Sequence, residues 1–272
     1  LSSLSLDLAT LSLFSAVAAA TELFTLSLHD ALPILGVYGA SVITAITAQN
    51  TLGVRSIHSV PLPVISEQIN AVFDDLNVAA VKTGMLGDAE TVACVADRLA
   101  HYQPAYLVVD PVMVAKSGDA LLLDSAVETL KTRLIPQASL ITPNLPEAAV
   151  LLGCAEPTTL EQMENMAEQL LSLGAGAVLL KGGHLEGAGD AVDMLFDGDQ
   201  LYRFSAPRIE TRNTHGTGCT LASAISAGLA AGLSMPEAVQ QAKDYISAAI
   251  SAADRLHVGH GQGPVHHFYR YW

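Results

Sequence analysis

From residue 36 onward, the chain alternates between short apolar runs and longer segments in which apolar residues recur every three or four positions. Residues 41–48 are rich in β-branched side chains and are followed by Gln49-Asn50, which predicts a strand. Continuous apolar runs predict further strands at 79–83, 106–110, 139–142 and 177–181. Helical spacing predicts the helices that separate them, at 66–76, 88–101, 125–134, 145–152 and 159–173.

The last third of the chain adds a hairpin and two helices to this alternation. Residues 191–196 and 201–204 flank Asp197-Gly198-Asp199-Gln200, a pattern typical of a β-hairpin. Small and apolar residues predict a buried helix at 221–231, and a long helix is expected at 235–256. Strands that alternate with helices predict an α/β domain whose parallel sheet is covered by helices on both faces.

Residues 1–35 do not resemble the remainder of the chain. They are rich in Leu, Ser, Ala and Thr, and no lysine or arginine occurs before Arg55, whereas a secretory signal starts with a basic stretch. A short helix is expected at 11–24, and 25–35 shows no clear period. We therefore expect 1–35 to be an atypical segment that is not native to the domain, and 36–272 to form that domain.

Composition narrows the classes of function. The 272 residues suit one α/β domain, and half of them are hydrophobic, which provides a large core. A net charge of −14 argues against a general nucleic-acid binder. No uninterrupted apolar run is long enough for a membrane span, so no membrane partner is expected. The three cysteines are far apart and lack metal spacing, which is typical of a protein of the reducing cytoplasm.

A glycine-containing turn at 213–220 directly precedes the helix of small residues. Gly216 and Gly218 permit close approach of the backbone, and free N–H groups meet the positive end of the helix dipole there, so the turn is a candidate anion hole. Cys219 would lie in the first helical turn, where the pKa of a thiol can be lowered. The alternative is a glycine turn before a core helix with an inert cysteine, and spacing alone does not distinguish the two.

Other candidate residues lie where strands end, the edge at which ligands bind in open parallel sheets. The segments concerned are polar or glycine-rich: 49–50, 84–85, 110–113, 142–147 and 181–184. Asp110 and Glu147 could bind Mg²⁺ through water, and Lys181 could pair with a phosphate. Helix capping, a favourable helix dipole and a snorkelling lysine are the corresponding structural alternatives.

Histidine and methionine carry less weight as signals of a site. The histidines His184, His215, His266 and His267 lack metal spacing, so hydrogen-bonding or surface roles are expected. Met85 and Met113 are more often core residues than ligand contacts. Acids, a lysine, backbone donors and a thiol together suit phosphoryl transfer.

These motifs resemble the hydroxymethylpyrimidine/phosphomethylpyrimidine kinases, which belong to the ribokinase-like kinases. Gly216-Thr217-Gly218-Cys219 is similar to the anion-hole motif of that family, most members of which carry Asp at the cysteine position. Further similar stretches are 44–51, 82–86, 110–113, 115–118, 141–148, 181–184 and 258–268. The resemblance runs from about Gly36 to the C-terminus. It implies a ribokinase-like three-layer α/β/α sandwich with a mainly parallel central sheet.

The resemblance also implies an activity and the residues that carry it. Family members use ATP to phosphorylate hydroxymethylpyrimidine and then its monophosphate, for thiamine biosynthesis, and are often homodimers. Cys219 would take the substrate hydroxyl proton, while the N–H groups of Gly216, Thr217 and Gly218 would hold the transferred phosphoryl group. Nucleotide contacts are implied for Asn144, Lys181, Thr214, Gly216 and Gly218, and contacts to Mg²⁺ for Asp110 and Glu147, with Asn144 helping to arrange the ion. Gln49 would bind the pyrimidine, with Met85 and Val112 near its ring.

One feature of the family is missing from the sequence. Members begin with a strand and a glycine-rich substrate loop, but the first glycine here is Gly36. We therefore expect unrelated sequence to replace that strand and loop, with loss of part of the pyrimidine pocket. Two alternatives stand beside the pyrimidine kinase: a cysteine-type pyridoxal kinase, and an inactive nucleotide-binding remnant. Gln49, Met85 and the histidine-containing tail favour the pyrimidine.

Overall fold

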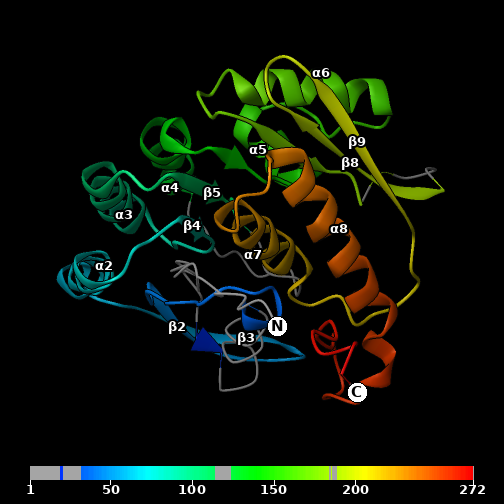
Figure 1. The fold of residues 1–272 in the computed structure, drawn as a ribbon, viewed down its shortest axis with the longest axis horizontal. Coiled ribbons are helices and arrows are strands. Elements are labelled where there is room, and N and C mark those ends of the chain that lie inside the picture. The colour runs from blue at the N-terminus through cyan, green and yellow to red at the C-terminus, as the bar shows by residue number, and fades with distance from the viewer. Residues whose placement is uncertain (1–18, 21–31, 114–123, 184, 186–188, 272) are drawn as a thin grey trace, which may run out of the picture.

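A six-stranded sheet forms the centre of the molecule (Figure 1). The computed structural model describes residues 19–20, 32–113, 124–183, 185 and 189–271. The sheet has the order β4-β5-β6-β7-β8-β9. Its parallel strands are β4 (Ala80–Thr83), β5 (Tyr106–Val109), β6 (Leu140–Ile141) and β7 (Val178–Lys181). The antiparallel hairpin of β8 (Asp190–Phe196) and β9 (Leu201–Pro207) completes it, as the pattern around 197–200 predicts.

Helices cover both faces of this sheet. One face carries α2 (Leu62–Asp75), α3 (Ala89–Tyr102), α4 (Asp124–Thr129), α5 (Leu145–Leu152) and α6 (Leu160–Leu171). The other carries α7 (Thr217–Ala230) and α8 (Met235–Ser251). Along β5 the side chains alternate between the two cores, because Val109 packs with the first group of helices and Val108 with the second. The result is the three-layer α/β/α sandwich that the sequence predicts.

A second, smaller sheet lies at the edge of the molecule opposite α6 (Figure 1). It contains β1 (Ala19–Ala20), β2 (Ala45–Asn50) and β3 (Gly53–Ser59), and β2 pairs with β3 as an antiparallel hairpin. The strand predicted at 41–48 therefore begins and ends later than expected. Sequence analysis missed β3, because most of its side chains are exposed and its apolar residues have no clear period.

The N-terminal segment differs from expectation where it is described. Ala19–Ala20 pairs in parallel with β2, so the helix predicted at 11–24 is wrong for these two residues, and the other positions of that helix lie outside the described ranges. Leu32 is buried with Val37, Ala80 and Ala227. The expected boundary at residue 36 stays a prediction.

Several helix boundaries also differ from the predicted ones. Helix α2 begins at Leu62 rather than at 66, since Pro61 and Pro63 suit the first turn. The helix predicted at 125–134 continues beyond α4 as a π-helical turn (Leu130–Leu134) and a 3₁₀ turn (Ile135–Gln137). The last helix ends at Ser251 and is followed by a 3₁₀ turn, Ala253–Arg255. Within the described ranges, no helix combines the length and apolar character that crossing a membrane requires.

Candidate active site

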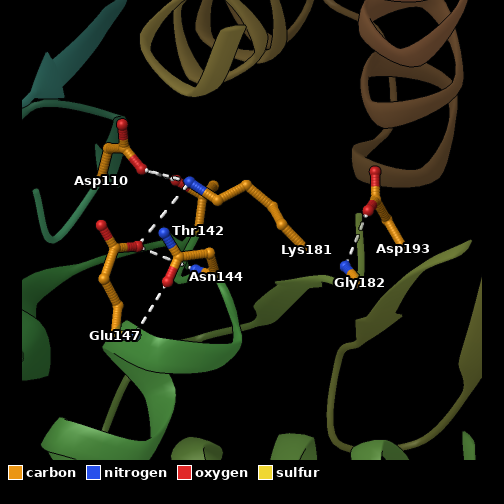
Figure 2. A network of polar contacts seen from close by, with 7 residues as sticks. All are labelled: Asp110, Thr142, Asn144, Glu147, Lys181, Gly182 and Asp193. Atoms are coloured by element: carbon orange, nitrogen blue, oxygen red, sulfur yellow. Dashed lines mark hydrogen bonds and ion pairs between the residues drawn. The ribbon is translucent and has the colours of Figure 1, made fainter. Parts of the chain in front are cut away.

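Three ionisable side chains meet where parallel strands of the central sheet end. Asp110 directly follows β5, Lys181 ends β7, and Glu147 lies in the first turn of α5, which follows β6. The Lys181 Nζ atom lies 2.8 Å from Asp110 Oδ1 and 3.9 Å from Glu147 Oε2 (Figure 2). The strand-end rule therefore brings together these three residues, which are separate in sequence.

Asp110 is held in its ionised form. Its side chain is 2% exposed, its backbone N–H donates to the Thr83 carbonyl, and the Thr142 hydroxyl donates to its Oδ1 at 2.9 Å. Burial alone would raise the pKa of the Asp110 carboxyl. The positive charges of Lys181 and Lys82, together with the hydrogen bonds that Lys181 and Thr142 donate to the carboxylate, outweigh burial and lower that pKa below its ordinary value.

Glu147 is both part of this cluster and part of a helix cap. Its backbone N–H donates to Asn144 Oδ1, and its carboxylate accepts from the Asn144 backbone N–H, each at 2.8 Å, which is the reciprocal capping box. Burial raises the pKa of the Glu147 carboxyl to about 7; Lys181 opposes this shift and the charge of Asp110 adds to it. Near neutral pH, a cation bound beside Glu147 would favour its ionised form.

Lys181 is fixed through its backbone as well as through its ammonium group. Its N–H donates to the Pro143 carbonyl at 2.9 Å, which joins the end of β7 to the loop that precedes α5. Burial would lower the pKa of the Lys181 ammonium, but the carboxylates of Asp110 and Glu147 raise it above its ordinary value. The side chain therefore carries a fixed positive charge.

The glycine turn adjoins this cluster. Gly216 is the N-cap of α7 with φ 84°, a left-handed conformation that glycine adopts without strain. The Thr217 N–H and hydroxyl both donate to the Thr214 carbonyl, at 3.3 and 2.7 Å. Among the described residues, no acceptor is found for the N–H groups of Gly216 and Gly218. These two donors fit an anion at the helix N-terminus.

Gly218 lies close to the charged cluster of Asp110, Glu147 and Lys181. A Cβ atom at this position would lie 3.3 Å from Lys181 Nζ and 3.8 Å from Asp110 Oδ2. The absence of a side chain at Gly218 therefore lets the helix N-terminus approach both charged groups. Backbone donors, a lysine and two carboxylates form one continuous site.

Cys219 follows in the first turn of α7 and is partly exposed. Burial raises the pKa of its thiol, and the positive charges of Lys82 and Lys181 oppose the shift without cancelling it. Burial, together with the negative charges of Asp110 and Glu147, outweighs the two lysines, so the shift runs opposite to the lowering that a first-turn position can produce.

Lys82 is a residue of this site to which sequence analysis gave no role. It belongs to β4, its side chain is 1% exposed, and its charge lowers the pKa of both Asp110 and Cys219. The sequence signal for Lys82 was a lysine inside the apolar run 79–83. A buried lysine needs a compensating negative charge, so this position indicates an acidic partner nearby.

Gln49 lies in a separate polar cavity of about 350 Å³. The β2–β3 hairpin, the segment before α7 and the C-terminal tail form it, with the residues Gln49, Asn50, Thr51, Leu52, Gly53, Arg212, His215, His260, Gly261 and Gln262. The tail is held by hydrogen bonds from Gln262 N–H to Thr51 O and from His215 N–H to Gly263 O. Since His215 precedes Gly216, this cavity borders the glycine turn.

Met85 and Val112 do not belong to the residues that line this cavity. Met85 is buried, and its carbonyl accepts a hydrogen bond from the Thr44 hydroxyl at 3.1 Å. Val112 is half-buried, and its N–H donates to the Asp110 carbonyl. The structure thus places Val112 next to Asp110 and Gln49 near the glycine turn. His184 and the stretch 115–118 lie outside the described residues.

Comparison with known proteins shows the family. A sequence profile of the family described as phosphomethylpyrimidine kinase matches residues 30–266. The chain belongs to this family. Two relatives are hydroxymethylpyrimidine/phosphomethylpyrimidine kinases, from Rhizobium meliloti and Escherichia coli. They are 57% and 50% identical over 238 residues, and each alignment covers 88% of this chain and 89% of the relative.

Solved structures of the phosphomethylpyrimidine kinase family and of a related kinase agree with the fold. The phosphomethylpyrimidine kinase from Clostridium difficile 630 is 41% identical with a TM-score of 0.76, and the match covers 89% of this chain and 98% of that one. Bacillus subtilis pyridoxal kinase in complex with ADP is 29% identical with a TM-score of 0.85, covering 96% and 98%. The predicted ribokinase-like sandwich and the assignment as a kinase are confirmed.

Proposed function

We propose that this member of the phosphomethylpyrimidine kinase family transfers the γ-phosphoryl group of ATP to 4-amino-5-hydroxymethyl-2-methylpyrimidine. It then phosphorylates the monophosphate, which gives the pyrophosphate used in thiamine biosynthesis. The observation that carries this proposal is the approach of the Gly218 backbone to the cluster of Lys181, Asp110 and Glu147. The 57% identity to a hydroxymethylpyrimidine/phosphomethylpyrimidine kinase supports the substrate.

The residues around the glycine turn carry the transfer step in this proposal. The substrate hydroxyl loses its proton to the Cys219 thiolate as its oxygen bonds to the γ-phosphorus and the bond to ADP breaks. Lys82 and Lys181 are the cations whose charges favour the thiolate. Lys181 and the N–H groups of Gly216 and Gly218 stabilise the charge on the transferred group, and the Thr217 N–H joins them by exchanging its 3.3 Å bond to the Thr214 carbonyl for the phosphoryl oxygen.

Asp110 and Glu147 suit Mg²⁺, which prefers oxygen ligands and keeps several waters. Asp110 Oδ1 already accepts from Lys181 and Thr142, so its Oδ2 is the oxygen left for the ion. Within the described part of the chain, no group of three or more metal-ligating side chains exists, so water and phosphate oxygens complete the shell in this proposal. When bound, the ion neutralises charge on the nucleotide phosphates. Asn144 and Thr214 contact those phosphates.

The pyrimidine binds next to Gln49 in this proposal. Met85 and Val112 do not line the Gln49 cavity, so their proposed place near the ring rests on the resemblance to the family alone. The cavity that contains Gln49 has a volume of about 350 Å³, within the usual range for small-molecule sites. Its border with the glycine turn would direct the hydroxymethyl group of the substrate toward Cys219.

The two other hypotheses are not favoured by the comparisons. Pyridoxal kinases share the fold but are 28–29% identical to this chain, against 50–57% for two pyrimidine kinases. An inactive remnant is not favoured either, because the relatives that are 50–57% identical over 89% of their length are hydroxymethylpyrimidine/phosphomethylpyrimidine kinases. The three free cysteines suit a reducing cytoplasm, where we expect the enzyme to act. We also expect it to form a homodimer. Light scattering of the purified chain tests that assembly.

A product assay tests the proposed reaction. The chain is incubated with Mg-ATP and hydroxymethylpyrimidine, and chromatography separates the monophosphate from the diphosphate; pyridoxal is the competing substrate. We expect both pyrimidine products, and a higher kcat/KM for the pyrimidine than for pyridoxal. Calorimetric binding of Mg-ATP without turnover of the pyrimidine would instead show a nucleotide-binding remnant. A preference for pyridoxal would assign the chain to the other kinase activity.

A further inference from the structure

A second buried ion pair lies behind Lys181. The Lys243 Nζ atom of α8 is 2.6 Å from Asp193 Oδ2 of β8, and the two side chains are 8% and 7% exposed. Lys243 also donates to the Ala191 carbonyl at 3.1 Å. Helix α8 is thereby fixed to β8, the strand that pairs with β7.

The other oxygen of Asp193 reaches the backbone next to Lys181. Asp193 Oδ1 accepts a hydrogen bond from the Gly182 N–H at 3.0 Å (Figure 2). In the β7–β8 register, Lys181 is paired with Asp193. A Cβ atom at Gly182 would lie 2.1 Å from the Val192 carbonyl oxygen, so the chain presses directly against β8 at this point.

The backbone at Lys181 is therefore held from two sides. The Lys181 N–H donates to Pro143 on the side of Asn144 and Glu147, and the next N–H, that of Gly182, donates to Asp193. These two bonds fix the peptide from which the long Lys181 side chain extends. Fixing this peptide sets the point from which the Lys181 ammonium reaches its partners, and a small displacement of a positioned group can cost much activity.

A buried ion pair is a poor device for stability alone, because desolvation of both charges offsets much of their attraction. We propose that Asp193 and Lys243 are positioning residues for phosphoryl transfer: they hold the Lys181–Gly182 peptide so that the Lys181 ammonium stays between Asp110 and Glu147. This inference rests on the proposed phosphate-binding role of Lys181. Lys243 neutralises Asp193, which would otherwise be an uncompensated anion opposite Lys181.

A double-mutant cycle tests the proposal. Asp193→Ala is made in the unmodified chain and in the Lys181→Met background, and both kcat and the calorimetric dissociation constant of Mg-ATP are measured. In the unmodified chain, we expect kcat to fall roughly 10- to 100-fold and the dissociation constant to rise several-fold, since a misplaced group can cost about 10²-fold. In the Lys181→Met background, Asp193→Ala should change kcat and the Mg-ATP dissociation constant by less than about twofold. The reason is that Lys181→Met has already removed the ammonium group through which Asp193 acts.

A conservative pair of variants adds a rescue experiment. Asp193→Asn keeps an oxygen for the Gly182 N–H but leaves the Lys243 ammonium buried without a counter-charge. Adding Lys243→Met removes that charge, so the double variant should recover most of the turnover lost in Asp193→Asn. Val239→Ala, a cavity-forming change on the same helix, is the control for stability and should lower Tm without changing the Mg-ATP affinity.

The outcomes separate this inference from the proposed function. Equal fold-changes for Asp193→Ala in both backgrounds, or no recovery in the double variant, would show a structural role only and overturn the inference. If the unmodified chain phosphorylates no pyrimidine, the proposed function fails. The cycle on Mg-ATP affinity still decides whether Asp193 acts through Lys181.

Discussion

Neighbouring carboxyl groups of the site differ in their affinity for protons. Asp110 has a lowered pKa because two lysines and the Thr142 hydroxyl favour its charge, whereas burial raises the pKa of Glu147 to about 7. Two acids with different environments can take different roles. Asp110 carries a permanent negative charge opposite Lys181, while the charge of Glu147 responds to what binds beside it.

Removal of the Cys219 thiol should affect turnover rather than nucleotide binding. We expect Cys219→Ala to lower kcat by about 10²–10⁴-fold, the usual contribution of general acid–base catalysis. The dissociation constant of Mg-ATP should change little, because backbone donors and Lys181 remain. Steady-state kinetics and calorimetry measure the two quantities.

Cys154→Ala is the matched control for this substitution, since Cys154 is exposed and lies in the turn after α5. It should leave turnover unchanged. Near-normal turnover of Cys219→Ala would instead show that another group, or water, takes the proton.

At the residue scale, sequence analysis located the charged groups that follow a strand. Asp110 and Lys181 stand at the ends of apolar runs, where their position at the sheet edge can be predicted from the alternation of strands and helices. Lys82, Asp193 and Lys243 had no such position. The importance of all three depends on their burial, and that of Asp193 and Lys243 also on their pairing across 50 residues of sequence. Neither burial nor such a distant pairing can be read from local sequence.

Among the elements, α5 shows how a helix cap can serve a site. The reciprocal bonds of Asn144 and Glu147 end the loop after β6 and aim the Glu147 carboxylate at Lys181. A similar cap begins α8, where the Ser234 N–H and hydroxyl donate to the Glu237 carboxylate. This cap belongs to the helical layer on the other face of the sheet and lies far from the charged cluster in sequence. The two caps allow a matched comparison.

Asn144→Ala should reduce both stability and activity. Loss of the cap costs about 1 kcal/mol of unfolding free energy. Turnover should fall by roughly tenfold or more, since the Glu147 backbone N–H loses its acceptor and the helical turn that carries the Glu147 carboxylate is held less firmly. Ser234→Ala should cost a similar free energy with unchanged kcat. Denaturant unfolding and kinetics on both variants check this, and equal kcat values for the two would contradict a role of the cap in the site.

The glycines of α7 explain how the second helical layer fits. A Cβ atom at Gly228 would lie 3.0 Å from the Cβ of Ala238, so a side chain there would crowd α8 and the glycine lets α7 and α8 pack closely. This close contact brings α8, and with it Lys243, against the sheet. Sequence periodicity predicted both helices but not their separation, which depends on which small residues face each other.

For the whole molecule, the C-terminal tail completes the layer formed by α7 and α8. The His266 N–H donates to the Ala249 carbonyl, and the Tyr245 hydroxyl lies 3.2 Å from His267 Nδ1. Burial lowers the pKa of His267 to about 4, with a smaller contribution from His266. The folded molecule therefore holds His267 in its neutral form.

His267 should lower stability as the pH falls from about 6.5 to about 4, because in this window the unfolded chain binds a proton at His267 and the folded chain does not. Glu147, whose pKa is raised to about 7, acts in the opposite direction in the same window, so the His267 contribution is measured as the difference between the unmodified chain and a His267 variant. The pKa shift of His267 corresponds to roughly 3 kcal/mol of unfolding free energy, which is retained above pH 6.5 and lost below about pH 4. Denaturant unfolding at several pH values measures it.

His267→Gln should remove the acid-destabilising contribution, so that stability relative to the unmodified chain rises as the pH falls through this window, whereas the same change at the exposed His257 should leave the profile unchanged. An unchanged slope in His267→Gln would show that other groups cause the acid sensitivity.

The sequence by itself determined the layers, most of the helices and strands, and the members of the site that follow strand ends. Periodicity and strand-end chemistry are local properties, so they can be read without coordinates. Only the tertiary structure decided that Gly218 lies against Lys181 and Asp110, that the Cys219 thiol has a raised pKa, and that Asp193 and Lys243 support Lys181. Each of these depends on distances and burial among residues far apart in the chain, which no local pattern encodes.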